Sequence, residues 1–336
     1  MGLFHFLNVK QGDCSIIQHP SGRVTMIDVN NASSAPEDVA AHFAAQERMV
    51  LAGTSGALVD QSQFPVNPIA YMRARGINSL FRFVVTHPDM DHMGGIKDLF
   101  EEFGPPNFWD TDIEEKKDGP FGYGHNRPDW TFYQRLHKGE GLFGTKRLVL
   151  NAGDTAQFWN QGPPYGSGDN LHILSPTRAL TKHANETEDP NDGGYVILYV
   201  TPAGRILFCG DSHDETWAHL IANYSAWIRN VDLLIAPHHG RHSDRSFDFL
   251  KIVNPTMTFF GNAPTEHLAH ANWRRRGLLV VSNKQANSMI VDTSGPLMKV
   301  FVTNGAYARS IDPNAQYSTV HGGWGAWTIT PRRLAA

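Results

Sequence analysis

The run His87-Pro-Asp89-Met-Asp91-His92 constrains this 336-residue chain more than any other feature. It follows an apolar stretch typical of a buried strand, and it packs two imidazoles and two carboxylates into six residues. Alternate side chains of an extended segment point the same way, so His87, Asp89 and Asp91 can converge while His92 turns back across them. A solvated polar loop is the alternative, but four ligand types at this spacing favour a site for zinc, manganese or iron.

Two later segments end in residues of the same kinds. One apolar strand ends in Gly-Asp211, and a second ends in Pro-His238-His239-Gly. A turn is the commoner explanation for Gly-Asp after a strand. Because all three segments leave predicted strands in this order, we expect them to meet at one site.

Predicted strands alternate with predicted helices along the chain, which favours an α/β fold. We expect one domain over residues 1–336, with loop-rich insertions at about residues 31–66 and 104–170. The expected strands are 3–9, 14–19, 24–28, 80–86, 148–150, 171–174, 195–201, 205–209, 233–236, 256–260, 278–282, 288–292 and 298–302. The expected helices are 37–48, 67–76, 130–138, 215–228 and 246–253, with another that begins near Gly95.

Composition narrows the class of protein further. A net charge of −4 is too mild to indicate a nucleic-acid or membrane surface. No apolar segment approaches the roughly 20 residues needed to cross a bilayer, and no leader precedes the first strand. We therefore expect a soluble, cytoplasmic protein with no membrane partner. The two cysteines, Cys14 and Cys209, lie in predicted strands and are interpreted as core thiols.

With these segments in place, His87-Pro-Asp89-Met-Asp91-His92 resembles the His-x-[His or Asp]-x-Asp-His signature of the metallo-β-lactamase superfamily. Within it, the chain is most similar to the hydrolase domain of ComEC-type DNA-uptake competence proteins and to their free-standing relatives. That similarity rests on residues 6–13, 26–28, 87–92 and 237–240, and it covers about residues 3–270. It implies a four-layer αββα sandwich with loop-rich insertions.

The resemblance also implies two divalent metal ions, zinc or manganese, and a ligand set. The implied ligands are His87 and Asp89 for one ion, Asp91, His92 and His238 for the other, and Asp211 between them. His238 is preferred because it comes first off its strand, which leaves His239 to support the ligands or to contact substrate. The sequence leaves open which of the two is the ligand.

One departure from the superfamily pattern concerns a further histidine that usually precedes the strand leading to Gly-Asp. This chain carries Asn191 there, as competence-type relatives tend to, so Asn191 is a candidate contact to metal or substrate. His183 is the other candidate substitute, although a solvated loop histidine is the commoner case. Asp28 and Thr86 are candidate hydrogen-bond partners of the ligands.

Three kinds of residue are candidates for the reaction itself. Asp91 is expected to orient the attacking water or to receive its proton. His270 is preferred over His267 as the group that helps the leaving group depart. Arg241 and Arg245 are expected to bind phosphate oxygens, because guanidinium donors match them in pairs.

The function that these residues favour is a dinuclear metal-dependent hydrolase, a phosphodiesterase or nuclease that acts on nucleic acid or nucleotide-type substrates through a metal-bridging hydroxide. A carboxylic ester, lactone or amide hydrolase is the alternative within enzymes, because the same chemistry attacks carbonyl groups. A non-catalytic binding module with a structural metal is the alternative outside them. The oligomeric state is unknown from the sequence.

Overall fold

In a computed structural model, the larger of two sheets has ten strands among the described residues, which are 2–54, 58–114, 127–161, 168–243, 245–264 and 267–332. Its order is β15-β16-β14-β13-β1-β2-β3-β4-β5-β6, with parallel pairing from β3 to β6. The bounds are β1 (Leu3–Phe6), β2 (Ser15–Gln18), β3 (Val24–Ile27), β4 (Arg82–Val84), β5 (Asn107–Asp110), β6 (Lys146–Val149), β13 (Met289–Asp292), β14 (Met298–Val302), β15 (Tyr317–Ser318) and β16 (Gly323–Ile329).

The smaller sheet has six strands in the part of the chain that the structure describes, in the order β12-β11-β10-β9-β8-β7. They are β7 (Leu171–Ser175), β8 (Val196–Thr201), β9 (Gly204–Phe208), β10 (Leu233–Ile235), β11 (Met257–Phe260) and β12 (Leu279–Ser282). The strands β9, β10, β11 and β12 run parallel to one another. Their carboxyl ends therefore share one edge of the sheet.

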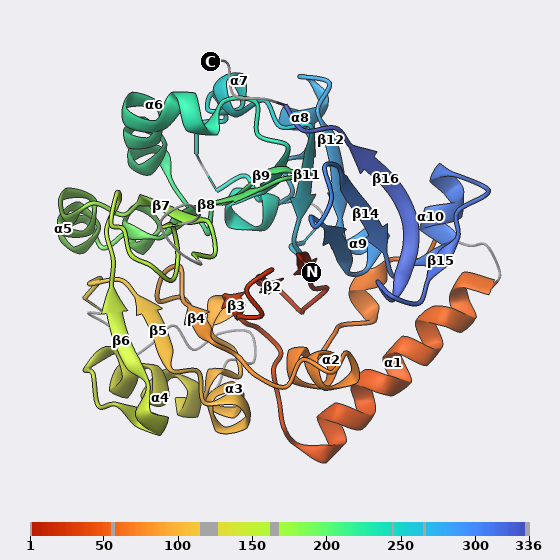
Figure 1. Cartoon of the computed structure of the whole chain (residues 1–336), viewed down its shortest axis with the longest axis horizontal. Coiled ribbons are helices and arrows are strands. Elements are labelled where there is room, and N and C mark those ends of the chain that lie inside the picture. The colour runs from red at the N-terminus through yellow and green to blue at the C-terminus, as the bar shows by residue number, and fades with distance from the viewer. Residues whose placement is uncertain are drawn as a thin grey trace.

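Helices cover the outer faces of both sheets. They are α1 (Pro36–Thr54), α2 (Pro68–Ala74), α3 (Ile96–Phe103), α4 (Arg127–His137), α5 (Arg178–Thr187), α6 (Asp214–Ile228), α7 (Leu250–Val253), α8 (His270–Arg274), α9 (Asn283–Ala286) and α10 (Gly305–Ile311). In Figure 1, α2, α3 and α4 lie on one side of the strands, and α5, α6 and α7 lie on the other. The expected αββα sandwich is confirmed.

Alternation along the strands explains the four layers. Val84 of β4 and Ile206 and Phe208 of β9 belong to the apolar cluster between the sheets. Phe83 faces the other way, into a cluster with α2, α3 and α4, and Leu207 faces a third cluster with α6 and α7. Since successive side chains of a strand point to opposite faces, an apolar run buries both of its faces in this arrangement.

Most of the expected strands are confirmed to within two or three residues, and β14 matches its expected range. The expected helix 246–253 was too long, since only Leu250–Val253 is α-helical. Sequence reasoning did not predict β5, α5 or the aromatic strand β16. The described parts of segment 104–170 supply β5 and β6 to the large sheet and α4 to its cover, so this segment is partly built into the sandwich.

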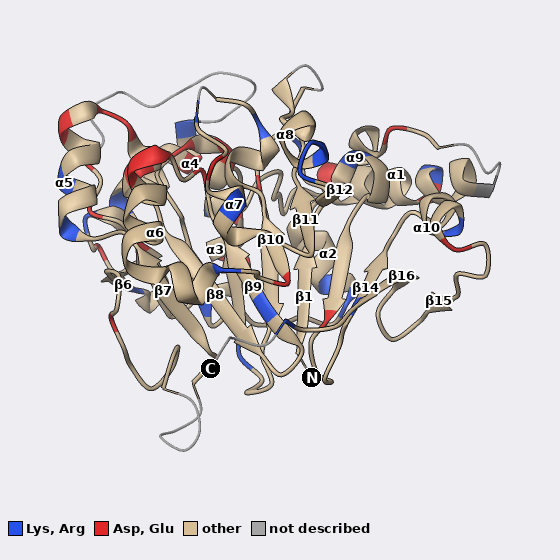
Figure 2. Cartoon of the chain, turned by 90° about the horizontal axis from the view of Figure 1, so that it is seen from above, with Lys and Arg blue, Asp and Glu red and all other residues tan. Residues whose placement is uncertain are grey.

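Basic and acidic residues occur on many of the described helices and strands (Figure 2). Figure 2 shows basic and acidic residues on the same helix at α5. None of the described helices combines the length and the apolar character that a membrane crossing requires. Cys14 and Cys209 are both buried and unpaired, which confirms their interpretation as core thiols.

The three motif segments leave parallel strands at corresponding ends. The run from His87 to His92 follows β4, Asp211 follows β9, and His238 follows β10. The strands β9 and β10 are neighbours in the small sheet, and β4 lies in the facing sheet. Packing the two sheets face to face therefore brings the three segments together at one edge of the sandwich.

A buried ion pair joins the large sheet to the start of β7. The Arg82 guanidinium, 1% exposed, donates to Asp169 at 3.2 Å and to Thr25 at 2.8 Å. Arg23 donates to both carboxylate oxygens of Asp169, and Ser21 donates to one of them at 2.7 Å. Asp169 thus balances two guanidinium groups, one of them inside the core.

We expect Asp169→Ala to lower the free energy of unfolding by roughly 3 to 5 kcal/mol, because it leaves the buried Arg82 charge without a counter-ion. The matched control is Glu102→Ala, which removes an exposed partner of Arg73 and is expected to cost less than about 1 kcal/mol. Urea denaturation followed by circular dichroism measures both. Equal costs for the two variants would contradict the assignment.

Candidate metal centre

A left-handed turn sets the two adjacent histidines. His238 and His239 have φ angles of 51° and 56°, and Gly240 follows with 86°. A Cβ atom at Gly240 would lie 2.2 Å from Cδ2 of Phe260, so only glycine fits at that position. Because the backbone coils tightly here, the two rings leave the turn in different directions, with 83° between their planes.

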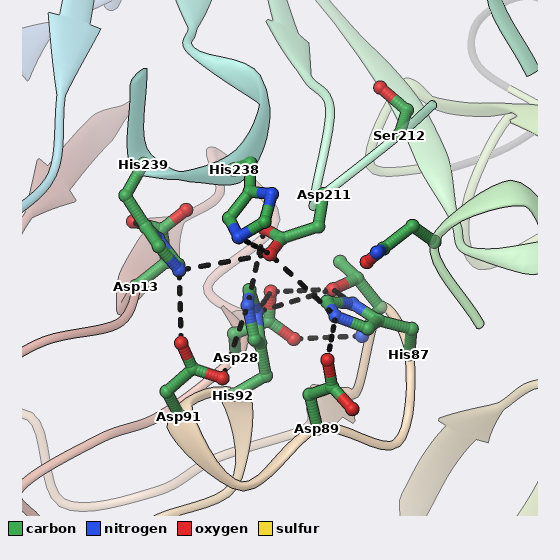
Figure 3. A network of polar contacts seen from close by, with 12 residues as sticks. Asp13, Asp28, His87, Asp89, Asp91, His92, Asp211, Ser212, His238 and His239 are labelled. Carbon is green, nitrogen blue, oxygen red and sulfur yellow. Dashed lines mark hydrogen bonds and ion pairs between the residues drawn. The ribbon is translucent and has the colours of Figure 1, made fainter. Parts of the chain in front are cut away.

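The first group of donors consists of His87, His92 and Asp211, whose ligand atoms lie within 4.8 Å of one another. All three residues are buried. Asp211 Oδ1 lies 3.2 Å from His92 Nε2, and Asp211 Oδ2 lies 3.8 Å from His87 Nε2. Asp89 adds a carboxylate oxygen 3.4 Å from His87 Nε2, on the side that faces solvent. Figure 3 shows these side chains pointing toward one another.

The second group consists of Asp91, His92 and His239, again within 4.8 Å. His239 Nε2 lies 3.2 Å from Asp91 Oδ2 and 3.8 Å from Asp211 Oδ2. His92 and Asp211 therefore stand between the two groups. The sequence interpretation placed His238 with Asp91 and His92, but the structure places His239 there.

Polar partners assign the proton of three rings to Nδ1, through hydrogen bonds for His92 and His87 and through an ion pair for His239. His92 Nδ1 lies 2.9 Å from Asp28 Oδ2, and His239 Nδ1 lies 2.9 Å from Asp13 Oδ1. The Thr86 hydroxyl donates to Asp28 and therefore accepts from His87 Nδ1 at 3.1 Å. A carboxylate only accepts, so each of these rings keeps the Nε2 lone pair that a metal needs.

His238 has the opposite proton arrangement. The Arg245 guanidinium donates to His238 Nδ1 at 2.8 Å, so the neutral ring carries its proton on Nε2. That Nε2–H group lies 3.5 Å from Asp211 Oδ2. Burial is the main reason that the pKa of His238 falls to about 3, which keeps the ring neutral. His238 is thus a hydrogen-bond donor beside the cluster.

Arg245 itself is buried and already engaged. Besides His238, it donates to the backbone carbonyl groups of Ser212 and Asp211. The expectation that Arg245 binds substrate phosphate is therefore not supported by its position. Its role in the structure is to hold the Asp211 segment and to orient the His238 ring.

The electrostatics of the cluster favour positive charge at its centre. Burial by itself lowers the pKa of His92, but Asp211, Asp28 and Asp91 outweigh it and raise the pKa well above the ordinary value. Burial also opposes the shift of His239, whose pKa rises to about 10 beside Asp13 and Asp211. The carboxyl groups of Asp91 and Asp211 have lowered pKa values despite burial. For Asp91 the neighbouring rings of His92 and His239 are the cause, and for Asp211 the rings of His238, His92 and His239.

These residues fit divalent cations. The buried atoms His87 Nε2, His92 Nε2 and Asp211 Oδ1 have no hydrogen-bond partner, although buried polar atoms normally do. Imidazole nitrogens and carboxylate oxygens are the ligands that zinc and manganese accept. Bound cations would satisfy the unpartnered atoms and would supply the positive charge that the carboxylates favour.

The structure separates the remaining candidates. The 3₁₀ turn Pro190–Gly193 carries Asn191. A Cβ atom added at the next residue, Gly194, would lie 3.6 Å from the Cβ of His87, so this turn borders the first group. The Asn191 side-chain oxygen is buried and unpartnered. His183 lies on α5, outside every donor group found among the described residues.

His270 is not oriented toward the donors. Its ring packs edge-on against Phe260, with centroids 4.8 Å apart, and His270 is not among the described residues that line the cavity over the site. His267 and Arg241 do line that cavity. The preference for His270 over His267 is therefore a poor fit to the geometry.

The sequence analysis assigned no role to Asp13, and it did not predict that Arg245 contacts His238 and the Asp211 segment. Asp13 lies beyond β1, and its carboxylate holds His239. The signal for it was present, because Asp13 ends the Gln-Gly-Asp run that carried part of the family resemblance. Nothing in the sequence marks Arg245 as the partner of His238.

A cavity of about 1400 Å³ opens over the donors. Asp89, Asp91, Asp211 and His238 form part of its wall. His87, His92 and His239 lie behind them, 1% exposed or less. The buried rings can hold cations from below while the carboxylates and the cavity give access to a substrate.

Comparison with known proteins agrees with this architecture. The sequence model of a family described as the metallo-beta-lactamase superfamily matches residues 7–253. Tm1679, a metal-dependent hydrolase of the beta-lactamase superfamily, is 12% identical with a TM-score of 0.50, and the match covers 88% of this chain and 100% of that chain. Igni18, a metallo hydrolase from the archaeon Ignicoccus hospitalis, is 12% identical with a TM-score of 0.46, and the match covers 86% and 99%.

At such identities the likeness to these structures concerns the fold alone. No curated protein sequence matches the chain significantly.

We expect His239→Ala to weaken binding of one of the two cations by at least about tenfold, because it removes a donor nitrogen. His238→Ala is the matched control, one residue away in the same turn, and should retain both ions. Metal content after dialysis, measured by atomic emission, and a chelator titration compare the two. Loss of metal from His238→Ala alone would restore the original preference for His238.

Proposed function

Because the chain belongs to the metallo-β-lactamase superfamily, we propose that it is a dinuclear metal-dependent hydrolase that cleaves phosphodiester bonds in nucleotide-type or nucleic-acid substrates. The choice of phosphodiesters rests on one observation, the position of two basic residues, Lys10 and Arg241. Both line the cavity beside the donors, and neither has a side-chain partner among the described residues. Two free cations at the mouth of a metal site suit an anionic substrate better than an ester or a lactam.

The proposed ligand assignment follows from the tautomers. We assign His87, Asp89 and Asp211 to one cation, and Asp91, His92, His239 and Asp211 to the other. Asp211 is shared because its two oxygens lie 3.2 Å from His92 and 3.8 Å from both His87 and His239. Asn191 borders the first group and is the proposed outer contact where the superfamily usually has a further histidine. Zinc and manganese both suit this set.

Two divalent cations held by these residues would lower the pKa of a nearby water molecule toward neutrality and would polarise the bond under attack. The chain itself contributes orientation and charge. Asp91 Oδ2 lies 3.2 Å from His239 Nε2 and the Asp91 side chain is 24% exposed, so its other oxygen remains available to orient water or to receive a proton. His238 presents its Nε2–H to the same space, where it can donate to a phosphoryl oxygen.

The similarity of residues 6–13 and 237–240 to ComEC-type hydrolase domains supports a nucleotide-type substrate. Hydrolysis of a carboxylic ester, lactone or amide is the alternative, because the same donor set acts on carbonyl groups. A structural metal in a non-catalytic module is less consistent with the site. Structural zinc sites are closed by four ligands, whereas this cluster opens into a cavity.

With zinc or manganese added, we expect the protein to hydrolyse bis-p-nitrophenyl phosphate faster than lactone and β-lactam substrates, because Lys10 and Arg241 favour the anion. Asp211→Ala should abolish that activity while leaving the far-ultraviolet circular dichroism unchanged. Initial rates across the panel measure the preference. Preferred cleavage of a lactone, or full activity in Asp211→Ala, would refute the proposal.

We expect Asp28→Asn to reduce metal affinity and hydrolysis by roughly 10- to 100-fold, because the amide no longer offers His92 Nδ1 a charged acceptor. Asparagine tolerates the left-handed backbone of Asp28, whose φ is 56°, so the fold should be retained. Asp292→Asn is the matched control, since it changes a carboxylate that contacts His321 and is not part of the described cavity wall. Equal activity in both variants would contradict the role of Asp28.

A further inference from the structure

The cavity continues away from the metal donors along one face of α1. The α1 residues in its wall are Asp38, Ala41, His42, Ala45 and Arg48. Their spacing of three or four residues places them on a single face of the helix. Two of the five are alanines, so this wall leaves room for a ligand. At about 1400 Å³, the cavity exceeds what a small phosphodiester alone would fill.

Charge divides the cavity into two parts. The wall beside the donors carries the cations Lys10 and Arg241. Among the described residues, the wall formed by α1, α3 and the start of α4 carries the acidic residues Asp38, Asp98 and Asp129 and the basic residue Arg48. Asp98 and Asp129 accept backbone hydrogen bonds from Ser34 and from Gly95, respectively. The metal end therefore suits an anion, and the α1 end repels one.

The α1 end also carries specific neutral hydrogen-bonding groups. His42 Nδ1 accepts from the backbone N–H of Asn67 at 3.2 Å, so the neutral ring carries its proton on Nε2. That Nε2–H has no partner among the described residues, and burial lowers the pKa of the ring. The exposed side chain of Gln63 lines the same region and is also unpartnered in the described chain. Donors of this kind, with the Asp38 carboxylate as acceptor, match hydroxyl groups.

Base stacking finds no support in the lining. Among the described residues of the cavity wall there is no Phe, Trp or Tyr. Proteins that follow a single strand of nucleic acid combine a basic groove with aromatic platforms. Here the described wall beyond the metal donors is acidic and carries no aromatic side chain. It therefore does not favour a polynucleotide strand along α1.

On the basis of the proposed function, we propose that the substrate is a phosphodiester whose second half is an uncharged, hydroxyl-bearing group of the sugar or polyol class. The phosphate binds at the donors beside Lys10 and Arg241. The hydroxylated group lies against α1, where Asp38, His42 and Gln63 supply its hydrogen bonds. Ala41 and Ala45 leave the space that this group occupies.

The test compares three p-nitrophenyl phosphodiesters that differ in their other half: bis-p-nitrophenyl phosphate, the 6-phosphodiester of glucose, and an oligothymidylate with the ester at its end. We expect the glucose ester to have the highest kcat/KM, by about tenfold, because it gains hydrogen bonds at α1. Ala41→Trp fills the α1 end and should remove that gain. A preference for the oligothymidylate would overturn the proposal in favour of a nucleic-acid strand.

Ala44→Trp is the matched control, because Ala44 is exposed on the same helix and is not part of the described cavity wall. It should leave all three rates unchanged. Calorimetric titration of glucose 6-phosphate into the metal-loaded protein separates this proposal from the proposed function. Weaker binding in Ala41→Trp, but not in Ala44→Trp, supports the α1 site even if no phosphodiester is cleaved. Equal binding in both variants overturns it.

Discussion

Negative charge held in a small buried volume is the constraint on which this structure depends. Asp211 is 4% exposed and faces four imidazole rings, while Asp13 and Asp28 stand behind two of those rings. Carboxylates this close together are stable only with positive charge between them. The face-to-face packing of the sheets brings the strand ends together, and the cost of that arrangement is offset by the cations that the donors fit.

The sequence was sufficient to predict the parts of the molecule that depend on local pattern. Apolar runs such as Ile206 to Cys209 predicted buried strands, and polar ligand residues at their exits predicted a shared site. Asp28 and Thr86 were expected beside the ligands, and both contact them. These inferences succeed because strand periodicity and the placement of strand ends at a sheet edge are short-range consequences of sequence.

The features that could not be predicted from the sequence depend on contacts between distant segments of the chain. His238 and His239 are equivalent by pattern, and their proton positions differ only because Arg245 contacts one and Asp13 the other. His270 has a suitable chemical type, but its ring packs on Phe260 instead of facing the donors. The strand β5 and the helix α5 carry weaker periodic signals, so tertiary packing decides their structure.

The adjacency of His238 and His239 has a consequence for how such a centre can change over evolutionary time. One short left-handed turn carries both His239, the ring that we assign to a metal, and His238, the ring that donates a proton, in adjacent residues. An insertion or a deletion at this turn would displace both functions at once. On the proposal that α1 contacts substrate, divergence of substrate preference is easier there, because its residues in the cavity wall can vary one by one on a regular helix without disturbing the donors.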